Sequence, residues 1–403
     1  MNINNRHISM QRRKTKNMWM VKLFSADQLS PTFLEPFILS GYRACETNLT
    51  ECLQSALRRT NETLNFWTHF IPFLYFLWRM LQLSFCLDFV NDPFTWPLLG
   101  QLVCTCLYLS ASSFAHLLSC LSERARHVCF FFDYSSLGMY SFGCCIAYRC
   151  YSFPQNLLNT EFFNLYIPIG VLNAILMCSC GACGSRFMTE SLFRHLCRLS
   201  SFMIPYIFCS LPLLYRVTVC PDDECEAASV AVHRWQFVAA FFTAFIYATH
   251  LPERLAPGKF DIFFHSHQLF HLTASIATML QVNALIIDMN DRRTFLETAI
   301  GVPTFWYSLG LLMVVFSIKM FLVLCFSICV FRHPEPKHIY RLNNGYVLTM
   351  QNECIENSHI YTKTKWNQLH DGSNTVSNMT CIKPKNICNA DNKYKTLLKT
   401  KIK

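Results

Sequence analysis

The sequence predicts an all-α fold: a bundle of membrane-spanning helices, with a seven-helix core and an eighth helix at its C-terminal end. Only 15% of the 403 residues are charged and 52% are hydrophobic, including 36 phenylalanines, whereas soluble domains carry roughly 25% charged residues. The apolar residues also gather into long stretches, each close to the ~20 residues that cross the hydrocarbon of a bilayer. This composition excludes a soluble enzyme, a disordered protein and a nucleic-acid-binding module.

The predicted spans follow one another with short polar connections, and the fifth is the least regular because Pro205 and Pro212 interrupt it. Their approximate bounds are residues 65–86, 96–120, 128–150, 162–182, 200–218, 230–250, 264–287 and 303–331.

Charged residues between the spans predict their orientation, because lysine and arginine accumulate on the cytoplasmic side of a membrane. The N-terminal segment is basic and has neither the apolar core nor the cleavage site of a signal peptide. Odd-numbered spans are followed by acidic residues such as Asp88 and Asp222. Even-numbered spans are followed by arginines such as Arg124 and Arg186. We therefore expect both ends of the chain to be cytoplasmic.

The chain divides into three parts on this basis. Residues 1–64 form a cytoplasmic segment, 65–331 form the transmembrane bundle, and 332–403 form a polar tail that is expected to be disordered. Apolar residues at helical spacing predict an interfacial helix over residues 47–64. The sequon at Asn61 lies on the cytoplasmic side of this topology, so we expect no glycan there.

Ionisable side chains lie at four positions where apolar ones would be less costly. His116 lies near the end of the second span, Asp133 near the start of the third, and His267 and His271 near the start of the seventh. The second span runs in the opposite direction to the third and seventh, so all four residues lie at a similar depth in the cytoplasmic leaflet. An ionisable residue inside a bilayer is a candidate functional residue, since its burial is expensive.

The spacing of these residues predicts a zinc site. His267 and His271 are four residues apart, which places both imidazoles on one helix face. With His116 they supply three nitrogen ligands and leave a fourth position open, as in catalytic zinc sites. Asp133 would hold the bound water, and Ser112 lies one turn before His116 on the same face. Zinc lowers the pKa of such a water to about 7. A single histidine at a helix end usually just reaches towards the interface, so the prediction rests on the coincidence of the three.

Cysteines and one lysine have less specific explanations. Cys178, Cys180 and Cys183 lie among small residues at the end of the fourth span, which favours helix packing, with lipidation and a second metal site as alternatives.

Lys319 lies deep in the last span and is expected to pair inside the bundle. Cys220 and Cys225 flank an acidic external loop and are candidates for a disulfide.

An ordered set of motifs accompanies the polar residues, in the segments 40–43, 61–69, 112–116, 132–134, 248–261 and 265–271. Through them the chain resembles the progestin and adipoQ receptor family over residues 22–335, most closely its membrane progestin receptor branch and, within that branch, the gamma type. An eighth span also fits this branch. The resemblance implies zinc ligands at His116, His267 and His271 and a water-holding carboxylate at Asp133.

Two functions follow from the resemblance. The first is a plasma-membrane receptor that binds a steroid such as a progestin and signals rapidly, without acting on genes, through a G protein or another cytoplasmic partner. The alternative is a zinc-dependent hydrolase of lipid amides, similar to a ceramidase, which a ligand would regulate. A purely structural zinc ion that ties two spans together is the third explanation. The sequence does not identify the ligand or the oligomeric state.

Overall fold

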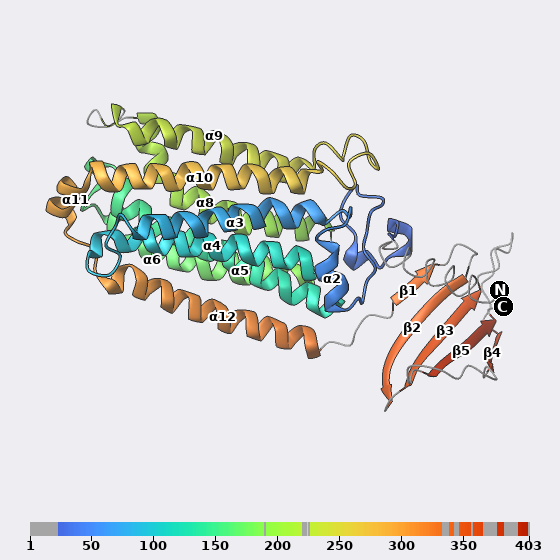
Figure 1. Ribbon diagram of the computed structural model, residues 1–403. Helices are drawn as coiled ribbons and strands as arrows, with labels where there is room; N and C mark the ends of the chain where they lie inside the picture. The colour runs from blue at the N-terminus through green and yellow to red at the C-terminus, as the bar shows by residue number, and fades with distance from the viewer. Residues whose placement is uncertain are drawn as a thin grey trace, which may run out of the picture.

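Long helices lie side by side along most of the computed structural model (Figure 1). The structure describes residues 23–188, 191–219, 224 and 226–332, together with five strands further along the chain. The helices are α2 (Leu49–Ser55), α3 (Thr63–Ser84), α4 (Trp96–Leu118), α5 (Glu123–Ala147), the π-helix η4 (Tyr148–Ser152), α6 (Glu161–Leu172), the π-helix η6 (Asn173–Gly181), α7 (Ala182–Gly184), α8 (Ser191–Val219), α9 (Ala228–Thr249), α10 (Ser266–Asp291), α11 (Arg293–Ile300) and α12 (Leu309–Arg332). Short 3₁₀ turns lie at Ala26–Gln28, Pro31–Phe33, Pro93–Thr95, Gln155–Leu157, Ser185–Phe187 and Phe305–Tyr307.

Each predicted span overlaps one long helix. Among the described residues, six helices are both long and apolar enough to cross a membrane: Pro93–Leu118, Glu161–Phe187, Leu192–Val219, Ala228–Thr249, Ser266–Asp291 and Leu309–Arg332. The chain is therefore a multi-pass membrane protein with a helical bundle, as predicted. The other two, α3 and α5, have the length and lie in the same bundle, but are less apolar. The total of eight spans and the cytoplasmic N-terminus stay predictions.

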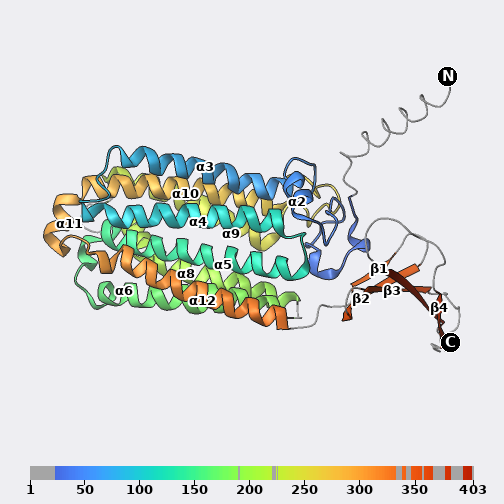
Figure 2. The ribbon, with the colours of Figure 1, turned by 60° about the horizontal axis from the view of Figure 1, so that its bottom comes forward.

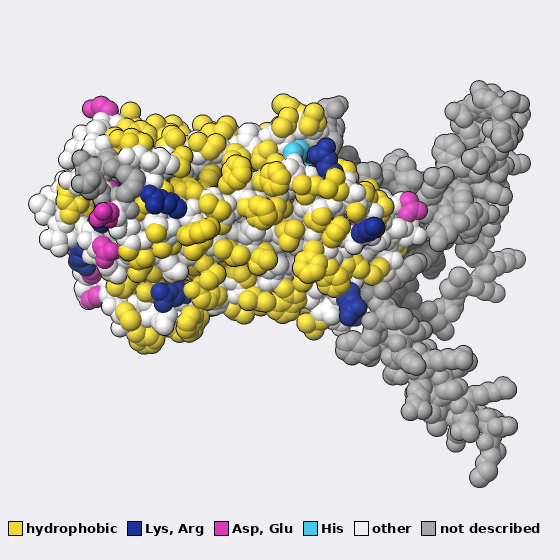
Figure 3. Space-filling model, turned by 90° about the horizontal axis from the view of Figure 1, so that it is seen from above, with side chains coloured by type: hydrophobic (Ala, Val, Ile, Leu, Met, Phe, Trp, Pro, Cys, Tyr) yellow, Lys and Arg dark blue, Asp and Glu magenta, His cyan; other side chains and the backbone are white. Residues whose placement is uncertain are grey.

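The core helices form a ring around the bundle axis. Along the ring, α3 packs on α4, α4 on α5, α5 on η6, η6 on α8, α8 on α9, α9 on α10, and α10 again on α3. Helix α12 lies outside this ring, against α5 and η6 (Figures 1 and 2). The described long helices thus form a ring with the C-terminal helix packed against its outside. Hydrophobic side chains cover the middle of the face in Figure 3, and charged side chains lie nearer the two ends.

The predicted fifth span is longer than expected. Pro205 and Pro212 lie inside α8, which continues unbroken over 29 residues. Within a helix bundle, neighbouring helices and hydroxyl side chains satisfy the backbone groups that a proline leaves free. Proline is therefore a weaker sign of a helix end in a membrane than in a soluble protein.

Lys319 of α12 is fully buried, and its partners explain the π-helix η6. Its ammonium group donates to the Ala174 carbonyl at 2.7 Å and to the Ser179 hydroxyl at 2.8 Å, both on η6. A π-helical turn changes the pairing of backbone carbonyls, and the lysine supplies a donor to one of them. The predicted pairing of Lys319 inside the bundle is thus what the structure shows.

The segment before α3 contains one short helix, α2, within the range of the predicted interfacial helix. Leu49 and Leu53 of α2 are exposed and Cys52 is buried. Its place at the membrane interface stays a prediction. Asn61 is buried, and its main-chain carbonyl accepts a hydrogen bond from His265.

Beyond α12 the structure describes five strands. They are β1 (His338–Arg341), β2 (Tyr346–Ile355), β3 (Ser358–Lys365), β4 (Ser377–Ile382) and β5 (Tyr394–Lys401). The strand order is β1-β2-β3-β5-β4, and only β3 and β5 pair in parallel. Threonine, isoleucine and tyrosine recur in β2 and β3, and these residue types favour strands.

A buried ionic cluster joins the helices at the α11 end of the bundle. Asp288 of α10 accepts hydrogen bonds from Arg216 of α8 at 2.9 Å and from Ser229 of α9 at 2.5 Å. It also accepts from Ser152 of η4 at 2.6 Å and lies 3.1 Å from the Nε2 atom of His233. One carboxylate therefore ties together four elements that are far apart in the sequence.

Replacing Asp288 by asparagine should destabilise the protein, because the buried Arg216 would lose one of its two carboxylate partners and keep only Glu224, at 2.5 Å. Removal of one partner of a buried ion pair costs about 3–5 kcal/mol. Thermal unfolding of the purified protein in detergent should show a clearly lower midpoint for Asp288→Asn. Asp291→Asn, three residues further on and exposed, should unfold like the wild type. Equal midpoints for the two variants would contradict a structural role of the cluster.

Candidate metal centre

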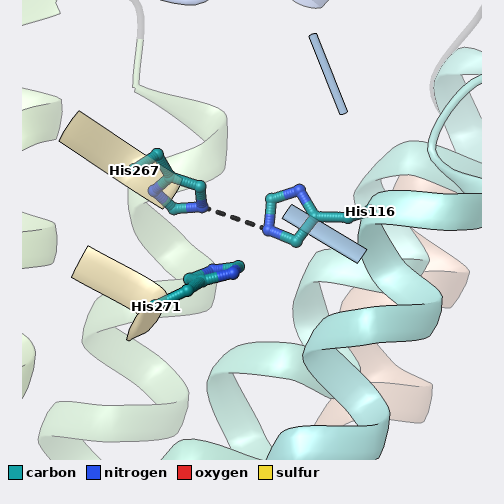
Figure 4. Close-up of side chains that lie close together, drawn as sticks. All are labelled: His116, His267 and His271. Atoms are coloured by element: carbon teal, nitrogen blue, oxygen red, sulfur yellow. Dashed lines mark hydrogen bonds between the residues drawn. The ribbon is translucent and has the colours of Figure 1, made fainter. Parts of the chain in front are cut away.

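Three histidines meet at the α2 end of the bundle. His116 lies on the last turn of α4, and His267 and His271 lie on the first two turns of α10. The Nε2 atoms of His116 and His267 are 3.1 Å apart. One ring nitrogen from each of the three residues lies within 4.8 Å of the others. Figure 4 shows the three imidazoles facing a common centre.

A carboxylate orients the His116 ring. The Nδ1 atom of His116 lies 2.8 Å from the Glu62 carboxylate, and both side chains are buried. Glu62 directly precedes α3 and also accepts a hydrogen bond from the Asn65 amide at 2.8 Å. The pairing holds the proton on Nδ1, so that Nε2 faces the centre with its lone pair free.

Main-chain and hydroxyl groups of α3 orient the His271 ring. Its Nδ1 atom lies 3.1 Å from the Asn65 carbonyl and 3.2 Å from the Thr68 hydroxyl. The His69 ring stacks on it with centroids 3.6 Å apart. His271 therefore also presents Nε2 to the centre.

Arg43 fixes the end of α4 that carries His116. Its guanidinium group is buried and donates to the carbonyls of His116 and Leu117 at 2.6 and 2.7 Å. It also donates to the hydroxyls of Ser55 and Ser119, each at 3.0 Å. The last carbonyls of a helix have no partner within the helix, and here a single arginine supplies several donors to them.

Glu253 fixes the start of α10, as Arg43 fixes the end of α4. Its carboxylate accepts hydrogen bonds from the main-chain amide of Ser266, at 2.7 Å, and from the Ser266 hydroxyl. An acidic group at a helix N-terminus satisfies free amides and favours the helix dipole. The next residue, His267, thus starts from a fixed backbone.

The donor set fits a metal ion. Three imidazoles, two of them oriented by partners on their outer nitrogens, are typical ligands for a divalent transition metal. The ring nitrogens are buried and lie close together, which fits three ligands of one ion better than three rings with unrelated roles. The described residues contain this one group of three or more possible metal-binding side chains, so Cys178, Cys180 and Cys183 do not form a second one. Cys178 and Cys183 are buried, in keeping with helix packing. Cys220 and Cys225 lie outside the described residues.

Asp133 and Ser112 lie beside the histidines, where they border the same cavity. Ser112 is near enough to the Asp133 carboxylate to interact with it. The structure thus brings together all five residues that the sequence singled out. Glu62, Arg43, Asn65 and Glu253 received no role in the sequence analysis, although all four lie in segments that carry the family resemblance.

A cavity of about 370 Å³ extends from the histidines into the bundle. Its walls between α8, α9 and α10 include Phe202, Met203, Ala240, Ala244 and Phe270.

The other end of the cavity is polar and belongs to a hydrogen-bonded network. The Tyr140 hydroxyl donates to the Gln281 side chain at 2.5 Å, and Gln281 and Gln236 donate to the Tyr148 hydroxyl at 2.5 and 2.7 Å. The cavity is therefore apolar along its length and polar at both ends.

Comparison with known sequences identifies one family and several relatives that share one name. Residues 57–282 match the haemolysin-III related family. The chain is 39% identical to membrane progestin receptor gamma-B of Danio rerio over 335 residues, which cover 79% of this chain and 96% of the relative. It is 38% identical to membrane progestin receptor gamma of Homo sapiens over 321 residues, with 78% and 96% covered. With membrane progestin receptor delta of Homo sapiens it shares 42% identity over 284 residues, with 69% and 82% covered.

The geometry predicts the metal content of single variants. Purified His267→Ala should contain far less bound metal than the wild type, because one of three ligand atoms is lost. Glu62→Gln should keep the ligands but weaken the affinity by about 10–100-fold, since the partner that orients His116 is altered. Inductively coupled plasma mass spectrometry after dialysis against a graded chelator measures both effects.

His195→Ala is the matched control, because His195 borders the same cavity but is not one of the three clustered histidines. It should retain wild-type metal content. A wild-type protein without stoichiometric metal, or equal loss in the control, would contradict the metal centre.

Proposed function

Since the chain belongs to the haemolysin-III related family, with relatives named membrane progestin receptors, we propose that it is a membrane receptor for a progestin-type steroid. The family assignment agrees with the resemblance predicted from the sequence. The observation that carries the steroid proposal is the buried cavity. The cavity lies between several helices, so a bound ligand would contact more than one of them.

The cavity suits a rigid apolar molecule with oxygen atoms at its ends. Its volume of about 370 Å³ falls within the ~300–1,000 Å³ of typical small-molecule sites. Aromatic and aliphatic side chains would pack against the ring system of a steroid. At the far end, the amide and hydroxyl groups of Gln281, Gln236 and Tyr148 offer hydrogen-bonding groups, as sites of this kind usually do.

A ligand in this cavity would act on α8 and α9. At the α2 end these helices meet through the rings of His195 and Tyr247, stacked with centroids 5.5 Å apart. A ligand that separates or tilts the two helices would change this contact and with it the predicted cytoplasmic surface. A G protein or another cytoplasmic partner at the plasma membrane would recognise that change.

The metal in this proposal is zinc, held by His116, His267 and His271. Three neutral imidazoles with a fourth position open match the ligand set of catalytic zinc sites. Glu62 and the Asn65 carbonyl would keep the rings in the tautomer that binds metal.

Steroid binding can be tested with labelled progesterone and the purified full-length protein. We expect saturable binding to the wild type and loss of binding in Ala240→Phe, because the larger side chain would occupy the cavity. Ala231→Phe, on the exposed side of the same helix, should bind as the wild type does. His267→Ala should retain binding, since the apolar walls remain. Unchanged binding in Ala240→Phe would exclude the cavity as the steroid site.

A second candidate function is hydrolysis of a lipid amide, and the position of Asp133 and Ser112 favours it. Bound zinc would supply Lewis acidity and a water of lowered pKa. Asp133 would accept a proton from that water and deliver it to the leaving amine. Ser112 would hold the carboxylate through its hydroxyl. Water and an amide such as ceramide would then yield a fatty acid and a free amine.

Mass spectrometry of the products tests the hydrolase proposal. The purified wild type should release fatty acid from ceramide, and Asp133→Asn should lower the rate by at least about 100-fold, since general acid–base catalysis contributes about 10²–10⁴-fold. Asp261→Asn, whose carboxylate binds Leu39 and Ser40 instead, serves as the carboxylate control. Equal rates in the wild type and Asp133→Asn would refute hydrolysis by this site. Loss of thermal stability without any change in lipid products on zinc removal would favour a structural ion.

A further inference from the structure

Three arginines border the cavity close to the histidines: Arg126, Arg186 and Arg198. Arg126 lies 2.6 Å from the Glu35 carboxylate and so has a counter-ion. Within the part of the chain that the structure describes, Arg186 and Arg198 form no ion pair. These two arginines distinguish this end of the cavity from the neutral polar end at Gln281.

The partners of both arginines are neutral groups. Arg186 donates through Nε to His127 Nδ1 at 3.0 Å, and its guanidinium group lies 4.8 Å from the centre of the Phe130 ring. Arg198 lies 5.2 Å from the centre of the Tyr134 ring and donates to the Ser185 hydroxyl at 3.5 Å, the outer limit for a hydrogen bond. These contacts orient the guanidinium groups but do not neutralise them.

Four acidic residues border the cavity, and three of them are engaged elsewhere. Glu35 pairs with Arg126, and Glu62 pairs with His116. Glu253 caps α10 through Ser266. Asp133 is near enough to both arginines to interact with their charges, but it forms no ion pair with either. Among the described residues, no carboxylate therefore lies within ion-pair distance of Arg186 or Arg198.

Such a pair of charges is expensive in a membrane protein without an anionic partner. Charged groups inside a bundle normally pair with one another, and guanidinium groups bind carboxylate, sulfate and phosphate with two parallel hydrogen bonds. The aromatic rings beneath Arg186 and Arg198 hold their planes, which reduces the entropy lost on binding an anion. An apolar cavity that begins next to two such groups matches an amphiphile with one anionic end.

We infer that Arg186 and Arg198 bind the anionic headgroup of the ligand, a carboxylate or sulfate, while its apolar body fills the cavity. The ligand class is thus an anionic amphiphile, such as a sulfated steroid or a fatty acid. This inference rests on the proposed function only in using the same cavity, and it narrows the chemistry of the ligand.

Matched pairs of ligands test the inference on the purified full-length protein. Binding of a steroid 3-sulfate is compared with that of the same steroid carrying a free hydroxyl, and oleate is compared with oleyl alcohol. In the wild type we expect at least one anionic member to bind about tenfold or more tightly than its neutral partner, because a hydrogen bond to a charged group contributes about 1.5–3 kcal/mol. The pair that shows the preference identifies the apolar body as steroid or acyl chain.

Arg186→Gln and Arg198→Gln should each remove most of this preference while the neutral member binds as before, which also shows that the variants are folded. Arg198→Lys should retain part of the preference, since the charge remains without the planar fork. Arg194→Gln is the matched control, because Arg194 lies one turn earlier on α8, is absent from the cavity walls and donates to the Met188 carbonyl.

Two results would overturn the inference: equal affinity for anionic and neutral members in the wild type, or a preference that survives in both glutamine variants. Progesterone binding, measured on the same samples, separates this outcome from the proposed function. Progesterone binding without an anion preference would refute only the headgroup site. Oleate binding that depends on the arginines, without any steroid binding, would refute the steroid receptor and support the headgroup site.

Discussion

Hydrocarbon offers no hydrogen bonds, so every polar group inside the bundle must find its partner on another part of the chain. This constraint accounts for the most specific contacts of the structure. Lys319 reaches across to η6, and Asp288 gathers partners from α8, α9 and η4. Apolar side chains alone would let helices slide or rotate at little cost, because lipid is as apolar as leucine. The polar contacts therefore determine how the helices align and keep the cavity between them open.

The same constraint explains why the segment before the first long helix contributes to the candidate metal centre. Arg43 binds the last carbonyls of α4, and Glu62 holds the ring of His116. Both residues lie outside the spans, yet they determine where the His116 ring points. Glu253 does the same for the start of α10, which carries the other two histidines. The site is thus assembled by its surroundings on both sides, and its precision comes from buried charges that each have several partners.

The sequence predicted those features that depend on a pattern repeated along the chain. It did not predict side-chain contacts between residues that are far apart in the sequence. Long apolar runs predicted the helices, and the spacing of His267 and His271 predicted a shared face. The matched depth of His116 followed from the alternating direction of the spans. The partners Glu62 and Arg43 depend on how the N-terminal segment folds back, for which no periodicity exists.

Asp288 was overlooked for a related reason. It lies at the end of a span, where an acidic residue is expected in the loop, and its partners Arg216 and His233 come from two other helices. The prolines of α8 led to a predicted span that was too short, because rules from soluble helices overstate the effect of proline in a membrane bundle.

The proposed receptor and the proposed hydrolase would use the same cavity, one to bind a ligand and the other to cleave a lipid amide. The charged residues that border the cavity suggest how the two functions could be related. A hydrolase that cleaves a lipid amide next to Asp133 would release a carboxylate at the histidine end of the cavity. The nearest unpaired cations among the described residues there are Arg186 and Arg198, which would retain that product. A retained anionic lipid would lie between α8 and α9, where a receptor ligand must act in order to move them. The headgroup site therefore makes the product of one function belong to the same chemical class as the ligand of the other. Slow hydrolysis and ligand sensing would then be compatible. The histidines would serve the hydrolysis, and the two arginines would hold its product where a receptor ligand acts.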